Sequence, residues 1–264
     1  MIAFRNLNEL NCPLVIAHRG ASALEHENTI LAFERAIEIG ADAIELDIRR
    51  TRDRILVVHH DRAIRPTGPP ISRLTYSAVL DEAASLAYHI PTLKETLELC
   101  ATTTSLDIEL KEIGYEHAVC SQVQEYYDLD NIAFTSFNPA SLARLRKIAP
   151  DVITGLLTGF VPHTVSGGTL RDISPLARLR RCRADFLAPN WRLLRFGMFR
   201  RIRQAGVPIV TWTVNRSPSV RRLIRLGVSG IITDYPDRVK SLVEDRTNEK
   251  RHPRIGRKRR FHDQ

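Results

Sequence analysis

A (β/α)₈ TIM barrel is the fold class that this sequence of 264 residues predicts, and three observations favour it. Short β-rich runs alternate with amphipathic helical segments along nearly the whole chain. Eight such runs occur, and eight is the number of parallel strands in this barrel. Polar residues also gather at the carboxyl ends of several runs, the face that carries the active site in TIM barrels.

The eight predicted strands are short, rich in apolar residues and separated by helical patterns or turn residues. In chain order they are Leu14–Ala17, Ala43–Ile48, Ser105–Leu110, Ile132–Thr135, Ile153–Leu157, Asp185–Ala188, Ile209–Val214 and Gly230–Thr233. Helices are expected between most of them, at Thr29–Ile39, Leu93–Leu99, Ala140–Ile148 and Ser219–Leu226 among others. Pro139 and Pro218 lie at helix starts, where proline is tolerated, and Gly40 and Gly227 end two of the helices.

One further strand-like run, Ile55–His60, does not fit the parallel pattern. Only Arg49–Arg54 separates it from the second strand, which is too short for a parallel crossover. The run is therefore predicted to fold back as a hairpin, a short excursion from the barrel with its turn near Asp53–Arg54. This register would place His60 roughly opposite Asp47.

Composition excludes some classes of protein. No apolar run approaches the ~20 residues that cross a bilayer, and Met1–Asn11 lacks the long apolar stretch of a secretory signal. The four cysteines show no C-x-x-C spacing, which favours free thiols in or near a core over disulfides or metal ligands. These features predict a cytoplasmic protein with a single barrel domain over residues 1–245.

The net charge of +9 is unevenly distributed. Residues 1–177 carry 16 Lys/Arg against 23 Asp/Glu, whereas residues 178–264 carry 23 against 7. Residues 246–264 carry 8 against 2 and are predicted to be a disordered basic tail, either solvated or bound peripherally to an anionic membrane. The arginines between Arg178 and Arg203 pose the same choice between a solvated face and a lipid-facing patch. Nucleic acid is the less favoured partner, and the oligomeric state is left open.

The candidate site combines carboxylates, histidines and basic side chains at strand ends. Glu45 and Asp47 alternate along one strand, so both point to the same face, and Glu109 ends the next barrel strand. Three carboxylates of this kind can hold a hard divalent cation through oxygen. His18 and His60 can move protons near neutral pH. The set predicts metal-assisted hydrolysis of a phosphate ester.

Other residues near this set have two interpretations each. Arg19 and Lys111 suit a phosphate, with structural ion pairs as the alternative. Trp212 is either a wall of the substrate site or a core aromatic. Glu27 and Asn28 serve either the helix start or the orientation of the site. Two neighbours are assigned away from the chemistry: Asp107 as a supporting partner one step deeper, and His59 as pointing away from the site.

Several stretches, in order from about residue 14 to 240, resemble the glycerophosphodiester phosphodiesterase family. They are Ala17–Gly20, Glu27–Thr29, Gly40–Asp47, Val57–Asp61, Ile90–Leu93, Ile108–Lys111, Ser136–Phe137, Trp212–Asn215 and Gly230–Pro236. The resemblance implies a TIM barrel that hydrolyses glycerophosphodiesters to glycerol phosphate and an alcohol. It implies Mg²⁺ or Ca²⁺ on Glu45, Asp47 and Glu109, acid–base work by His18 and His60, and phosphate contacts by Arg19 and Lys111.

Three departures from the family pattern bear on the site. His26 stands where proline is common, and Arg54 stands where the hairpin turn usually has glycine. The segment after His60 looks short, so residues 72–88 are expected to form at most a short lid. A lysophospholipase D acting on lysophospholipids is the alternative within the enzyme class. A non-catalytic barrel that binds membrane or nucleic acid through its tail is the alternative outside it.

Overall fold

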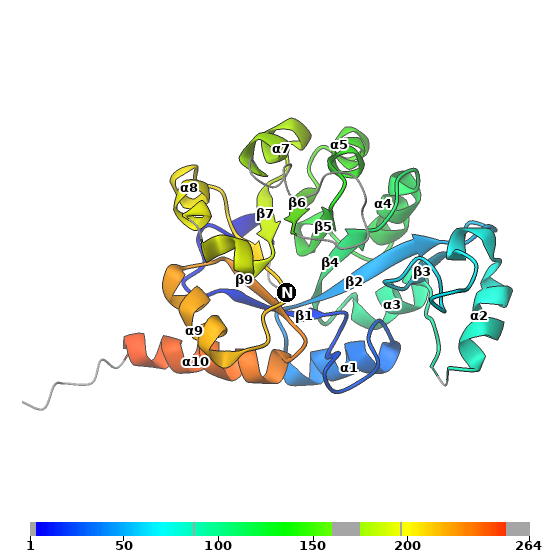
Figure 1. Cartoon of the computed structure of the whole chain (residues 1–264), viewed down its shortest axis with the longest axis horizontal. Coiled ribbons are helices and arrows are strands. Elements are labelled where there is room, and N and C mark those ends of the chain that lie inside the picture. Colours follow the sequence, from blue (N-terminus) through cyan, green and yellow to red (C-terminus); the bar gives the residue numbers. More distant parts are fainter. Residues whose placement is uncertain (1–3, 87, 160–174, 196, 252–264) are drawn as a thin grey trace, which may run out of the picture.

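Eight parallel strands form a nearly closed barrel with helices around it in the computed structural model, which describes residues 4–86, 88–159, 175–195 and 197–251 (Figure 1). The order around the barrel is β7-β6-β5-β4-β2-β1-β9-β8. Single bridges, Leu187 to Ile209 and Asn190 to Trp212, join β7 to β8. The strands are β1 Leu14–His18, β2 Ala43–Arg50, β4 Ser105–Leu110, β5 Ile132–Ser136, β6 Ile153–Thr158, β7 Phe186–Pro189, β8 Val210–Thr211 and β9 Gly230–Thr233. The predicted fold class is confirmed and a strand occurs in each of the eight predicted runs, although β8 has two residues where Ile209–Val214 was predicted.

The helices begin and end at the local signals that the sequence contains. Thr29 caps α1, Thr92 and Glu95 form a capping box on α3, and Gly40 and Gly227 adopt left-handed conformations after α1 and α9. The α-helices are α1 Ile30–Ile39, α2 Tyr76–Ala84, α3 Leu93–Cys100, α4 Glu116–Gln124, α5 Pro139–Ile148, α7 Pro175–Cys182, α8 Met198–Gln204, α9 Ser217–Leu226 and α10 Pro236–Arg251. The 3₁₀ turns are η1 Phe4–Asn6, η2 Ile71–Arg73, η3 Leu129–Asn131 and η4 Trp191–Arg195.

The barrel interior is apolar at one end and acidic at the other. Phe4 and Leu7 pack against Ile16, Ala43 and other inward residues at the amino end of the strands. Because side chains alternate along β2, the next two inward residues are Glu45 and Asp47, which lie nearer the carboxyl end of the strand. The intervening residues of β2 face outward and pack with the helices in a separate cluster that includes Ile44, Leu46 and Ile48.

The hairpin forms, but its predicted register is wrong by one residue. Strand β3, Leu56–Val58, runs antiparallel to β2 with Val58 opposite Ile48. The His59 amide donates to the Asp47 carbonyl at 2.9 Å, so His59 rather than His60 lies across from Asp47. The turn tightens because Arg54 takes the left-handed conformation, φ 69°, that glycine adopts more easily. Because the sequence has arginine and not glycine at this position, it predicted the turn less clearly.

The segment after the hairpin is a short excursion that packs on β3. Val57, Ile71, Val79, Ala83 and Ile90 form a small buried cluster that holds α2 in place. Figure 1 shows α2 at the edge of the molecule, beside the hairpin. The excursion therefore lies beside the barrel, next to the hairpin.

Helix α10 alters the expected tail. It continues to Arg251, so residues 246–251 of the predicted disordered segment are helical. Buried Val239, Leu242 and Val243 anchor the first half of this helix. Residues 252–264 lie outside the described residues.

Within the described chain, no helix is long and apolar enough to cross a membrane. All four cysteines are free, with Cys12 exposed and the other three buried.

Candidate active site

Three carboxylates converge at the carboxyl ends of β2 and β4. The parallel register sets Asp47 beside Glu109, and Glu45 lies two residues before Asp47 on the same face. One oxygen from each carboxylate lies within 4.8 Å of the other two. All three residues are buried. The predicted ligand set is therefore assembled, with oxygen donors suited to a hard divalent cation.

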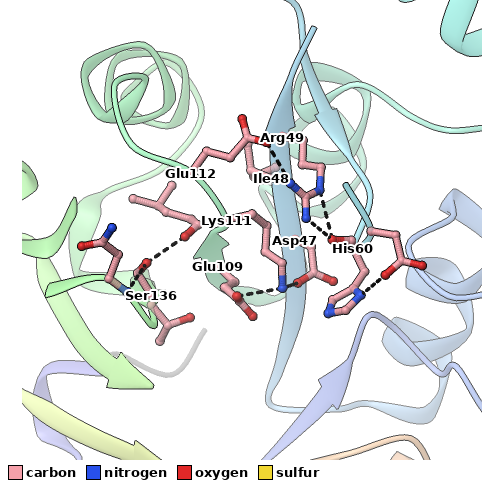
Figure 2. Close-up of polar contacts among 12 residues, drawn as sticks. Asp47, Ile48, Arg49, His60, Glu109, Lys111, Glu112 and Ser136 are labelled. Carbon is pink, nitrogen blue, oxygen red and sulfur yellow. Dashed lines mark hydrogen bonds and ion pairs between the residues drawn. The ribbon is translucent and has the colours of Figure 1, made fainter. Parts of the chain in front are cut away.

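Two basic side chains balance these carboxylates. Lys111 Nζ lies 2.8 Å from Glu109 Oε1 and 3.1 Å from Asp47 Oδ1, and Figure 2 shows it between them. Arg19 Nε lies 3.2 Å from Asp47 Oδ2, and its Nη1 lies 2.7 Å from Glu27 Oε1. Arg19 and Lys111 are thus at the site, where the structure shows their ion pairs; their contact with phosphate stays a prediction.

The electrostatics of the cluster follow from burial and from these pairs. Burial would raise the pKa of Asp47, but Lys111 and Arg19 hold it below its usual range. Burial, together with the Asp47 charge, raises the pKa of Glu45 well above its usual value. Burial would lower the pKa of Lys111, but Asp47 and Glu109 raise it. The three carboxylates and two cations together carry one net negative charge when all are ionised.

A constrained loop after β1 donates hydrogen bonds to two carboxylates of this cluster. Arg19 and Asn28 have left-handed backbone conformations, φ 55° and 57°, and the Asn28 amide donates to the Arg19 carbonyl at 2.9 Å. The Arg19 backbone N–H donates to Glu45 Oε2 at 3.0 Å, and Asn28 Nδ2 donates to Asp47 Oδ2 at 2.8 Å. Glu27 and Asn28 therefore contact Arg19 and Asp47, and Thr29 caps the helix. Strained backbone of this kind is typical of functional loops.

His18 is fixed at the end of β1 by a carboxylate that sequence reasoning did not select. Its Nδ1 lies 2.6 Å from Asp234 Oδ1, and its Nε2 lies 4.0 Å from Glu45 Oε2. Asn215 and Ser22 donate to Asp234 at 2.5 and 3.2 Å. Burial would raise the pKa of Asp234, but the hydrogen bond from His18 lowers it. Asp234 and Asn215 follow the last two barrel strands, and that position was their available signal.

His60 reaches the site from beyond the end of β3, where strand alternation no longer applies. Its Nδ1 lies 2.7 Å from Asp61 Oδ1. Its carbonyl accepts hydrogen bonds from Arg49 Nε and Nη2 at 3.0 and 2.6 Å, and Arg49 Nη1 pairs with Glu112 at 2.8 Å (Figure 2). Burial lowers the pKa of His60, although the Asp47 charge opposes this. His59 is more enclosed, and its Nε2 has no partner within the described residues.

Trp212 lies on the opposite side of the barrel mouth, after β8. Its Nε1 donates to the Ala188 carbonyl at 2.7 Å. Its ring meets Phe137 edge to face, with centroids 5.5 Å apart. Trp212 is half-buried, so this pair forms an apolar wall that remains partly accessible.

Asp107 lies deeper in the barrel, paired with Glu45 in the strand register. Thr135 donates to its Oδ1 at 2.9 Å. Burial raises the pKa of Asp107 to about 7.

Comparisons with known proteins agree with this fold. A model of the glycerophosphoryl diester phosphodiesterase family matches residues 18–238. A glycerophosphodiester phosphodiesterase from Caldanaerobacter subterraneus is 35% identical, covering 87% of this chain and 97% of the relative. A lysophospholipase D from Homo sapiens is 27% identical, covering 87% and 86%. A phosphodiesterase from Oleispira antarctica, solved with sn-glycerol-3-phosphate, has a similar fold, with TM-score 0.74, 24% identity and coverage of 88% and 97%.

Proposed function

We propose how this chain, which belongs to the glycerophosphoryl diester phosphodiesterase family, carries out its reaction at the barrel mouth. It is a phosphoric diester hydrolase, and its proposed substrates are glycerophosphodiesters, which it cleaves to glycerol 3-phosphate and an alcohol. The arrangement that carries the mechanism is a buried triad of carboxylates flanked by two histidines, each histidine hydrogen-bonded to its own carboxylate.

The residues fit a divalent metal, Mg²⁺ or Ca²⁺, held by Glu45, Asp47 and Glu109. Their oxygens are hard ligands, and the cluster with Arg19 and Lys111 carries one net negative charge when all five groups are ionised. A divalent cation would convert that charge to one positive, which complements the single negative charge of a phosphodiester. When bound, the cation would neutralise the non-bridging phosphate oxygens and polarise the phosphorus.

Arg19 and Lys111 are proposed to contact the phosphate, since both lie beside the carboxylates that would hold the cation. Both stay protonated because the surrounding carboxylates raise the pKa of each. Their existing ion pairs to Asp47 hold the two groups at the cluster before substrate arrives. Preorganised charge of this kind stabilises a transition state without the cost of reorienting dipoles.

The two histidines are proposed to move the protons. One takes a proton from the attacking hydroxyl, of water or of the substrate's own glycerol, as the new P–O bond forms. The other gives a proton to the leaving alkoxide as the old P–O bond breaks. Asp234 holds His18 so that Nε2 faces the cluster, and Asp61 holds His60 through its Nδ1.

A lysophospholipase D activity is the second candidate. The similarity to the human lysophospholipase D supports it, as does the apolar wall of Trp212 and Phe137 at the barrel mouth. In this case the wall would contact the acyl chain, while the charged residues would act on the phosphodiester as before.

Hydrolysis of glycerophosphocholine and of lysophosphatidylcholine, followed side by side, tests both candidates. We expect turnover of glycerophosphocholine that stops in EDTA and returns with Mg²⁺ or Ca²⁺. Faster turnover of lysophosphatidylcholine would favour the second candidate. Full activity in chelator, with no metal retained on elemental analysis, would contradict the metal-dependent mechanism.

A further inference from the structure

Three consecutive outer helices, α7, α8 and α9, carry positive charge only. Their sequences contain nine arginines and no aspartate or glutamate. Helices α1, α3 and α4, around the other side of the barrel, contain five acidic residues and two basic ones (Figure 1). Because charges of both signs normally alternate on a soluble domain, the difference gives the barrel an acidic side and a basic side.

The arginines of the basic side are exposed and lack acidic partners. Within the described part of the chain, eight of the nine are exposed and form no ion pair: Arg180, Arg181, Arg200, Arg201, Arg203, Arg221, Arg222 and Arg225. On the acidic side, by contrast, Arg35 pairs with Glu38 at 2.7 Å and Lys94 with Glu98 at 3.7 Å. An anionic surface placed against these exposed arginines would reduce the repulsion among them.

The basic side reaches the end of the barrel that carries the site. Turn η4 directly follows β7 and contributes exposed Arg192, whose guanidinium carbon lies 5.3 Å from the centre of the Trp191 ring. Exposed Arg216 lies before α9, where the chain leaves β8. The Trp191 amide donates to the Trp212 carbonyl at 3.0 Å, which links this rim to the apolar wall.

We propose that these ten arginines form a docking surface for an anionic phospholipid bilayer, which we call the arginine surface. It consists of the eight unpaired residues together with Arg192 and Arg216. Half-buried Trp191 at its edge has the apolar body and polar N–H that suit the interface between lipid and water. The docked protein holds the barrel mouth beside the lipid.

The distribution of charge favours a bilayer over nucleic acid. Single-stranded nucleic acid is held in a basic groove lined by stacking aromatics. The arginine surface instead extends over the outsides of three helices, an arrangement suited to a broad anionic plane. The proposal concerns binding alone and stands whether or not the proposed catalytic mechanism is correct.

Co-sedimentation of the full chain with phosphatidylcholine vesicles, with and without phosphatidylglycerol, tests the proposal. A variant with Arg200→Gln, Arg201→Gln, Arg221→Gln and Arg222→Gln removes four charges from the arginine surface. Because each basic residue near an anionic membrane strengthens partitioning about fivefold, the variant should bind at least ~100-fold more weakly at low salt. Binding of the unaltered chain should fall as salt rises.

A matched control removes the same charge from elsewhere on the barrel. Arg35→Gln, Arg52→Gln, Lys94→Gln and Lys147→Gln change four exposed basic residues, and this variant should keep its vesicle binding. Both variants keep the basic C-terminal segment, so a difference between them reports the arginine surface. Circular dichroism and turnover of a soluble diester confirm folding. Equal vesicle binding by the two variants would overturn the proposal, as would binding of an oligonucleotide, but not of vesicles, through the same four arginines.

Discussion

The two halves of the barrel mouth differ in chemistry. The half formed by β1, β2, β4 and β9 carries the three carboxylates, Arg19, Lys111 and His18, and these groups form a connected set of ion pairs and hydrogen bonds. Within the described residues, those that directly follow β5 to β8 are uncharged: Phe137, Gly159, Asn190 and Trp212. In the proposed mechanism, bond cleavage takes place at the charged half, and the apolar half contacts the rest of the substrate.

Removing one carboxylate should have the largest effect on activity. Glu45→Gln, Asp47→Asn and Glu109→Gln each keep the side-chain shape but remove a charge from the cluster. Because metal and electrostatic stabilisation supply several kcal/mol to the transition state, each change should lower kcat by about 10³-fold or more. Calorimetric titration with Mg²⁺ and Ca²⁺ should show weaker binding. Unaltered metal affinity in all three variants would place the metal elsewhere.

Removing either histidine should cost about 10²–10⁴-fold in kcat, the usual contribution of a general acid or base. His18→Ala and His60→Ala are the test changes, and steady-state kinetics on a soluble glycerophosphodiester is the measurement. His59→Ala is the matched control, and its effect should be far milder. An essential His59 would show that the neighbour opposite Asp47 in the hairpin register does the chemistry.

Arg49 should act as a positioning residue for His60, with a smaller effect. Arg49→Gln removes the guanidinium that binds the His60 carbonyl and Glu112, so the histidine loses its fixed position. We expect kcat to fall roughly 10–100-fold with little change in KM, because small misplacements at a reacting group are costly.

Arg50→Gln provides the control for that change. Arg50 is the next residue along β2 but points away from the site, donating to the Gly114 carbonyl at 3.1 Å. Its replacement should leave kcat nearly unaltered. Equal losses in the two variants would indicate a general weakening of β2 instead of a specific effect on His60.

The apolar half should respond through substrate binding. Trp212→Ala removes the accessible ring and should raise KM about tenfold for lysophosphatidylcholine, since burial of an acyl chain against it is worth roughly 1–2 kcal/mol. The effect on glycerophosphocholine should be smaller. A large loss of kcat on both substrates would move Trp212 from the wall into the catalytic group.

Truncation after Arg251 should have the smallest effect on chemistry. The cut lies beyond α10, whereas a cut after Asp245 would pass through that helix. Turnover of a soluble diester should stay within about twofold, because surface changes remote from the site are usually small. Vesicle binding at low salt should weaken, since basic residues are lost. A large loss of turnover would show that the segment contributes to the barrel or its mouth.

Local patterns in the sequence determined the barrel and most of its site. Two-residue alternation placed Glu45 and Asp47 on one face, and proline, glycine and capping residues marked the helix ends, because each signal acts within a few residues. The position of these carboxylates near the carboxyl ends of their strands placed them at the barrel mouth, since parallel strands end together. These inferences needed no knowledge of which distant segments meet.

Only the tertiary structure decided which distant partners complete the site. Asp234 meets His18 across 216 residues of sequence because the barrel brings β9 beside β1. The hairpin register depended on a left-handed Arg54, which sequence propensity does not favour. The observed register is shifted by one residue, so that His59 lies opposite Asp47 where His60 was predicted. The arginine surface likewise required three helices, each basic in sequence, to lie next to one another. Strand and helix formation is local, whereas these contacts depend on how the barrel closes.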